Sequence, residues 1–143
     1  MNTLRISYSK QSPAAYQGFI ATKTALEKST LGKEFIELIN LRISQINGCS
    51  FCLEMHTRSL REGGYPLAKL DSLAGWHASN LFDERERAAL AWAESVTNIA
   101  VTHAPDEVFE ALRAHFSDAE ISDLTFAIAL MNAFNRMAIS MRQ

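Results

Sequence analysis

Residues that favour the first turn of an α-helix recur along the whole chain, and these helix-start signals constrain the fold more than any other feature. Helix starts are expected at three prolines, which suit a first turn, and at two capping boxes. These signals are Pro13, Pro66 and Pro105, together with the pairs Asp83–Glu86 and Ser117–Glu120. Apolar residues between them follow the helical period, and strand-like alternation is limited to a faint run over 96–101. We therefore predict an all-α fold, a compact bundle of about six to seven helices.

The predicted helices cover most of the chain. They run from Pro13 to about Lys28, from about Lys33 to Ile46, from near Cys49 to about Glu62, from Pro66 to near Gly75, from Asp83 to about Ile99, from Pro105 to Phe116, and from Ser117 onward. The helix over 33–46 is apolar around most of its circumference, which predicts a central position. The last helix is apolar on more than one face, which favours the centre of the core or a subunit interface. Because no flexible linker interrupts the pattern, residues 1–143 are expected to form a single domain.

The charge balance argues against several classes of partner. The chain has 14 Lys and Arg residues against 16 Asp and Glu residues, for a net charge of -2. A nucleic acid or an anionic membrane surface would favour a basic protein, so neither partner is expected. Asn132, Asn135 and Arg136 interrupt the most apolar segment, so no membrane span is predicted. The first residues lack the apolar core of a secretory signal, and we expect a cytoplasmic location.

The only two cysteines form a C-x-x-C pair, Cys49 and Cys52. In a cytoplasmic protein this spacing suggests redox chemistry or metal binding rather than a structural disulfide. The pair lies at the start of a predicted helix, where unpaired backbone N–H groups favour the thiolate, and we expect an exposed turn. Because residues three and four apart share a helix face, Cys49, Cys52 and His56 form one stripe. His56 is therefore positioned to take or return a thiol proton.

Glu37 is the fourth candidate site residue. It lies twelve residues before Cys49 on the preceding helix, between the apolar residues Ile36 and Leu38. If the turn at Asn47-Gly48 folds the two helices back on each other, Glu37 reaches the cysteines. There its carboxylate would orient His56 or accept a proton from Cys49.

Redox chemistry is not the only role that a C-x-x-C pair can have. Free cysteines are often buried structural residues, so the pair could serve packing alone. A zinc site needs a fourth ligand, and His77, His103 and His115 do not stand at the spacing of zinc fingers. Covalent haem attachment requires a His directly after the second cysteine, and Leu53 occupies that position. Redox chemistry is therefore the favoured interpretation.

Glu37, Cys49, Cys52 and His56 together resemble the motif of the AhpD-like alkylhydroperoxidase group of the carboxymuconolactone decarboxylase family. The flanking segments LRISQINGCSFCLEMHT, LFDERERAALAWAESVT and ALRAHFSDAEISDLTFAIALMNAFNRMA are also similar to this family. The resemblance covers the chain from about residue 10 onward. One departure is Phe51, because some members carry a His just before the second cysteine.

The resemblance implies an AhpD-like helical fold that assembles into homo-trimers or homo-hexamers, with thiol-dependent peroxidase or disulfide-reductase activity. In the family scheme Cys52 attacks the hydroperoxide, Cys49 resolves the sulfenic acid into a disulfide, and Glu37 and His56 relay protons around Cys49. The substrate would be a hydroperoxide or a protein disulfide. No cofactor would be tightly bound, and the reductant would be an external dithiol, either a dihydrolipoyl group or a thioredoxin-like protein. Phe51 implies a simpler proton relay and weaker peroxidase activity.

Three points stay open at the level of sequence. Helix electrostatics alone favours Cys49, nearer the helix start, as the cysteine of lower pKa, whereas the family scheme favours Cys52. An acid–base enzyme similar to the lactone decarboxylases would need no thiol. A non-enzymatic helical protein would use the cysteines to sense redox state or to bind a metal.

Overall fold

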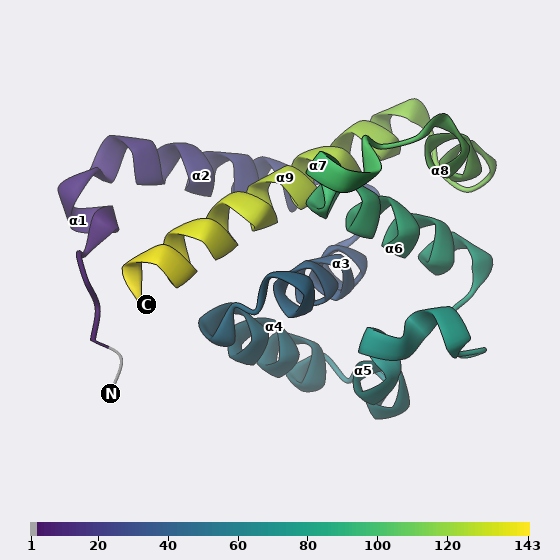
Figure 1. Ribbon diagram of the computed structural model, residues 1–143, viewed down its shortest axis with the longest axis horizontal. Helices are drawn as coiled ribbons and strands as arrows, with labels where there is room; N and C mark the ends of the chain where they lie inside the picture. The colour runs from purple at the N-terminus through teal and green to yellow at the C-terminus, as the bar shows by residue number, and fades with distance from the viewer. Residues whose placement is uncertain (1–2) are drawn as a thin grey trace.

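The computed structural model describes residues 3–143, which form nine α-helices and two 3-10 helices without a strand (Figure 1). In chain order these are α1 (Tyr8–Gln11), α2 (Pro13–Leu26), α3 (Lys33–Asn47), α4 (Ser50–Glu62), α5 (Leu67–Ser72), η1 (Leu73–Ala78), α6 (Glu84–Thr97), α7 (Ile99–Thr102), α8 (Asp106–Glu110), η2 (Ala111–Ala114) and α9 (Asp118–Met141). The predicted all-α class is confirmed.

Helix α3 lies at the centre of the bundle, with α4, α6 and α9 packed against it (Figure 1). The side chains of Leu38, Ile39 and Ile43 are almost completely buried. Each such side chain contributes about 1.5–3 kcal/mol when it leaves water. The central position predicted from its apolar circumference is therefore confirmed, and α3 is the element against which the rest of the chain is placed.

Both predicted capping boxes are present. Asp83 accepts the Glu86 N–H at 2.8 Å, and Ser117 accepts the Glu120 N–H at 3.2 Å. Each glutamate side chain in turn accepts the N–H of its capping residue. Local side chains thus satisfy the first N–H groups of α6 and α9, which explains why the starts of these helices could be predicted.

Other predicted boundaries are wrong. The helix predicted from Pro66 to near Gly75 is instead α5 followed by η1, which runs past Gly75 to Ala78. Gly75 lies inside η1 with non-helical angles (φ -106°, ψ 24°). The single helix expected from Pro105 to Phe116 is divided into α8 and η2. The faintly strand-like run over 96–101 is helical, because helical backbone hydrogen bonds, including Thr102 N–H to Asn98 O at 3.1 Å, satisfy its polar groups.

Helix α9 combines the longest apolar segment with deep burial. It is the one helix within residues 3–143 that is long and apolar enough to cross a membrane, a test that core helices of soluble proteins also pass. In the structure it packs against α2, α3, α4 and α6, and Leu124 and Ile128 have no exposed surface. The core position, one of the two predicted for this helix, is confirmed for its buried face, whereas Phe126 on another face remains exposed.

A buried amide network joins α9 to the end of α3. Asn135, which has no exposed surface, donates to the Ser44 hydroxyl at 3.1 Å and accepts from Asn47 at 3.0 Å. Asn47 also donates to Asn132 at 2.9 Å, and Asn132 donates to Thr97 of α6 at 3.1 Å. Losing any of these hydrogen bonds would leave a polar group without a partner inside the protein, which costs free energy of folding. The network therefore holds the last turn of α3 in one position.

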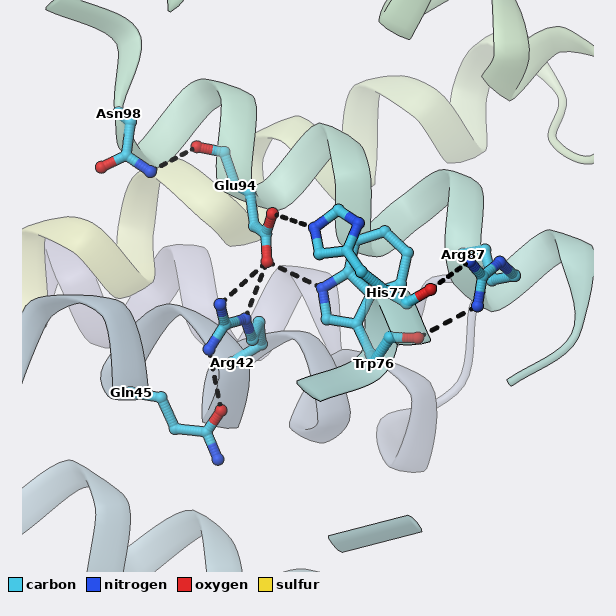
Figure 2. Close-up of polar contacts among 7 residues, drawn as sticks. All are labelled: Arg42, Gln45, Trp76, His77, Arg87, Glu94 and Asn98. Atoms are coloured by element: carbon cyan, nitrogen blue, oxygen red, sulfur yellow. Dashed lines mark hydrogen bonds and ion pairs between the residues drawn. The ribbon is translucent and has the colours of Figure 1, made fainter. Parts of the chain in front are cut away.

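A second polar cluster centres on Glu94 of α6 (Figure 2). Trp76 Nε1 donates to Glu94 Oε1 at 2.7 Å, Arg42 Nε donates to the same oxygen at 2.9 Å, and His77 Nε2 lies 2.9 Å from Oε2. Burial alone would raise the pKa of the Glu94 carboxyl. The hydrogen bonds from His77, Trp76 and Arg42 outweigh burial and lower this pKa below its ordinary value. The Glu94 cluster therefore ties α3, η1 and α6 together through a carboxylate.

Replacing Asn135 by Ala is expected to lower the free energy of unfolding by about 2–4 kcal/mol, because it leaves a cavity, deprives the Ser44 hydroxyl of its donor and removes one of the two hydrogen bonds of Asn47. Urea unfolding followed by circular dichroism measures the loss. Ser122→Ala, at an exposed position on the same helix, is the control and should change stability by less than about 0.5 kcal/mol. Equal stability of the two variants would contradict the role given to the amide network.

Replacing Glu94 by Gln is expected to lower the free energy of unfolding by about 1–2 kcal/mol at pH 7, because the ionised hydrogen-bond acceptor is lost. A carboxyl whose pKa is lower in the folded than in the unfolded protein stabilises the fold above its unfolded pKa of about 4.3. This contribution disappears as the pH falls through the folded pKa. The stability difference between wild type and Glu94→Gln should therefore shrink between pH 5 and pH 3, measured by urea unfolding. Glu107→Gln, at an exposed position, is the control, and a pH-independent difference for Glu94→Gln would refute the prediction.

Candidate active site

The turn between α3 and α4 presents the two cysteines. Gly48 ends α3 in the left-handed region (φ 70°, ψ 38°), which side chains disfavour and glycine adopts easily. Cys49 follows as the N-cap of α4, and its N–H donates to Ser44 O at 3.1 Å. The turn folds α4 back along α3, as the sequence at Asn47-Gly48 led us to expect.

Cys49 and Cys52 are joined by a disulfide, with their Cα atoms 5.3 Å apart. The Cys52 N–H lies 3.3 Å from Cys49 Sγ, so this sulfur caps the start of α4. Only 1% of Cys49 and 2% of Cys52 is exposed, and both pack against Ala138 of α9. The expectation of an exposed turn is therefore wrong. The sulfurs are covered by a helix distant in the sequence, which helix periodicity around the cysteines cannot reveal.

His56, one turn after Cys52 on α4, is buried and forms a pair with the partly buried Glu37. His56 Nδ1 lies 2.7 Å from Glu37 Oε2, a contact between α4 and α3. With Nδ1 donating to the Glu37 carboxylate, this bond fixes the ring orientation and directs Nε2 away from Glu37. The pair therefore has the arrangement of a general base held by an orienting carboxylate.

A cavity of about 360 Å³ lies between α2, α3, α4 and α9 and reaches Cys52. Its polar lining includes Glu37, Asn40 and His56, whereas Cys49 does not contribute to the lining. Most of the remaining wall is apolar. These wall residues include Ile20, Ile36, Phe51, Met55, Leu130 and Phe134. A molecule in the cavity would therefore meet Cys52 before Cys49, with an apolar environment around its non-reacting part.

The structure brings together all four residues predicted from the sequence. Phe51, at the position where a His occurs in some members of the resembling group, is 40% exposed and forms part of the cavity wall. Asn40 was not predicted as a site residue. The signal that could have found it was its position three residues after Glu37, because two polar side chains one turn apart share a face of an otherwise apolar helix.

No group of three or more His, Cys, Asp or Glu side chains suited to a metal ion occurs in the part of the chain that the structure describes. His77, one of the fourth ligands considered for zinc, instead lies 2.9 Å from Glu94 and stacks on Trp76. His77 therefore belongs to the Glu94 cluster rather than to the cysteine pair.

Comparison with known sequences identifies related proteins. The sequence pattern of the carboxymuconolactone decarboxylase family matches residues 13–95, a range that contains all four predicted site residues. Among curated proteins, the uncharacterized protein YdfG of Bacillus subtilis (strain 168) is 31% identical over 137 residues. The alignment covers 96% of this chain and 93% of that protein, so the similarity extends well beyond the cysteine motif.

Solved structures show the same architecture. A protein of unknown function from Agrobacterium tumefaciens, ATU0492, described as a candidate antioxidant defence protein AhpD, is 44% identical with a TM-score of 0.94. The match covers 99% of this chain and 97% of that one. An uncharacterized peroxidase-related protein from Ralstonia eutropha JMP134, described as an alkylhydroperoxidase AhpD core, is 29% identical with a TM-score of 0.80, covering 94% and 72% of the two chains. The AhpD-like fold expected from the resemblance is confirmed.

Proposed function

Because this chain belongs to the carboxymuconolactone decarboxylase family, we propose that it is a thiol-dependent peroxidase of the AhpD-like type. Its substrates are hydroperoxides, and the same cysteine pair can exchange with partner disulfides. One observation supports this proposal above all others. Cys52 lines a cavity together with the hydrogen-bonded pair His56 and Glu37, and Cys52 already holds the disulfide that such a reaction produces.

The first step starts from the reduced protein. His56 Nε2 accepts the proton of the Cys52 thiol, because Nδ1 is already committed to Glu37. The thiolate attacks the terminal oxygen of the hydroperoxide, so that an S–O bond forms and the O–O bond breaks. The departing alkoxide takes the proton from His56. The products are the sulfenic acid of Cys52 and an alcohol, and atoms and charge balance.

The second step regenerates the disulfide. The Cys49 thiol attacks the sulfenic sulfur of Cys52, an S–S bond forms, and the oxygen leaves as water. An external dithiol, a dihydrolipoyl group or a thioredoxin-like protein, then reduces the disulfide by exchange. We assign the attack on peroxide to Cys52 rather than Cys49 because Cys52 lines the cavity. Phe51 places no titratable group beside Cys52, so the proton relay of this chain consists of His56 and Glu37.

The family name favours a second candidate, an acid–base enzyme in which His56 and Glu37 act on a lactone or a related acid without a thiol. Alkylation of the reduced cysteines separates the two, because it would stop peroxide reduction and leave acid–base turnover intact. A third candidate, a redox sensor, would be oxidised once per chain but would not turn over when an excess of dithiol is supplied.

We also propose that the chain assembles into a homo-trimer or homo-hexamer. Apolar side chains remain exposed on its surface, including Phe126 of α9 (60%) and Val101 of α7 (83%). Phe126 borders a hollow next to Trp92 and Phe109, so the exposed apolar surface is continuous with a recess that another subunit can fill.

Light scattering after size-exclusion chromatography should give a mass of three or six times 15.9 kDa. Phe126→Glu is expected to lower this mass, because a charge buried in a subunit interface is costly. A wild-type mass of 15.9 kDa at micromolar concentration would contradict the proposed assembly.

Cys52→Ser is expected to lower the turnover of an organic hydroperoxide with a dithiol donor by at least about 10³-fold, because it removes the nucleophile. Cys49→Ser should react with one equivalent of peroxide and stop at a sulfenic acid on Cys52, detected by dimedone labelling and mass spectrometry. Ser50→Ala, an exposed position in the same turn, is the control and should retain turnover. Normal turnover by Cys52→Ser, or a sulfenic acid trapped only on Cys49, would remove the assignment.

A further inference from the structure

Two buried polar atoms on residues that line the cavity with Cys52 have no protein partner. Within residues 3–143, buried side-chain nitrogen or oxygen atoms without a hydrogen bond are found at Asn40 Oδ1, His56 Nε2 and Tyr65 Oη. Asn40 and His56 both line the cavity that reaches Cys52, whereas Tyr65 lies outside it. Two of the three unpartnered atoms thus belong to the same site.

Asn40 is an unfavourable choice for packing alone. It is only 8% exposed, and its neighbours Leu38, Ile39 and Leu41 are apolar and buried. A buried polar group without a hydrogen bond costs about 1–3 kcal/mol, and a leucine of similar size would avoid that cost. The buried Asn135 shows the contrast, because both ends of its amide are bonded to neighbouring side chains. The unused acceptor of Asn40 therefore indicates a role toward a ligand.

The position of Asn40 relates it to the reacting groups. It lies one turn after Glu37 on α3. Glu37 Oε2 in turn lies 2.7 Å from Nδ1 of His56 on α4. Asn40 and His56 thus approach the cavity from two different helices, with Cys52 on the same lining. In the present disulfide form both unpartnered atoms are closed to solvent. Reduction breaks the S–S bond and lets the sulfurs separate, and it is this dithiol form that meets a peroxide.

We propose that Asn40 is a substrate-binding residue that recognises the terminal O–H group of a hydroperoxide. This inference rests on the proposed peroxidase function. Asn40 Oδ1 accepts the hydrogen bond of the terminal hydroxyl, whose oxygen is transferred to Cys52. Protonated His56 donates from Nε2 to the other peroxide oxygen, which leaves as the alcohol. Both unpartnered atoms are thereby satisfied, and the O–O bond is held for attack by Cys52 Sγ.

This role distinguishes substrates by their chemistry. A hydroperoxide carries an O–H donor for Asn40, whereas a disulfide carries none. Loss of the Asn40 acceptor should therefore slow the reaction with hydroperoxides and leave thiol–disulfide exchange at Cys52 unchanged. A merely structural role, or an effect on ionisation of the Cys52 thiol, would slow both reactions together.

The experiment compares the reduced forms of wild type, Asn40→Leu, Asn40→Ala and Tyr65→Phe in two stopped-flow reactions. One uses cumene hydroperoxide and the other a neutral dipyridyl disulfide. Asn40→Leu is expected to lower the second-order rate constant with the hydroperoxide about tenfold or more, and to change that with the disulfide by less than about twofold. Asn40→Ala lacks the same acceptor without adding bulk and should behave alike. Tyr65→Phe removes an unpartnered buried hydroxyl outside the cavity and should match wild type in both reactions.

The outcomes separate this inference from the function on which it rests. If wild type reacts with the disulfide but not with cumene hydroperoxide or hydrogen peroxide, the proposed peroxidase function itself fails. If wild type reduces the hydroperoxide and both Asn40 variants keep its rate, the role of Asn40 is overturned. An equal loss in both reactions also overturns it, because Asn40 would then act on the thiol or on the site structure. A selective loss with the hydroperoxide supports it.

Discussion

The burial of α3 on nearly all sides is the constraint on which the remainder of the structure depends. Lys33 and Glu34 at the start of α3 are exposed, but over residues 37–44 the helix is surrounded by α4, α6 and α9. A polar side chain in this part of the helix loses its contact with water and therefore needs a hydrogen-bond partner or a functional role. Glu37 binds His56, Ser44 binds Asn135, and Arg42 binds Glu94. The polar residues of α3 thus point to the three places where the helix is connected to its neighbours.

These connections divide into two kinds. Those made by Asn135 and by Glu94 are satisfied within the protein and hold helices at fixed positions. The connection between Glu37 and His56 is incomplete, because His56 Nε2 is buried without a hydrogen-bond partner. Asn40 Oδ1, one turn further along α3, is also buried without a partner. Satisfied buried groups contribute stability, and unsatisfied ones reduce it. The incomplete side of α3 is also the side that faces Cys52 and the cavity, which is why the proposed chemistry is placed there.

Because α9 covers the disulfide, it limits how reactants can approach the cysteines in the proposed reaction. With Cys49 and Cys52 almost fully buried, the reactants must reach Cys52 through the cavity, whose walls are largely apolar. Such an environment suits the compact organic hydroperoxide that the proposed function requires. In the proposed reaction, Cys49 does not line the cavity and would therefore be shielded from the peroxide and available to resolve the sulfenic acid of Cys52.

Much of this protein was determined by the sequence alone, wherever the physical cause was local. The starts of α6 and α9 follow from capping residues three positions apart, and the stripe of Cys49, Cys52 and His56 follows from helical spacing. Only the tertiary structure decided that Ala138 covers the sulfurs, that Asn40 is left without a partner, and that η1 continues through Gly75. Burial and hydrogen-bond satisfaction depend on which helices meet, and those contacts join residues far apart in the chain, where neither periodicity nor capping chemistry carries information.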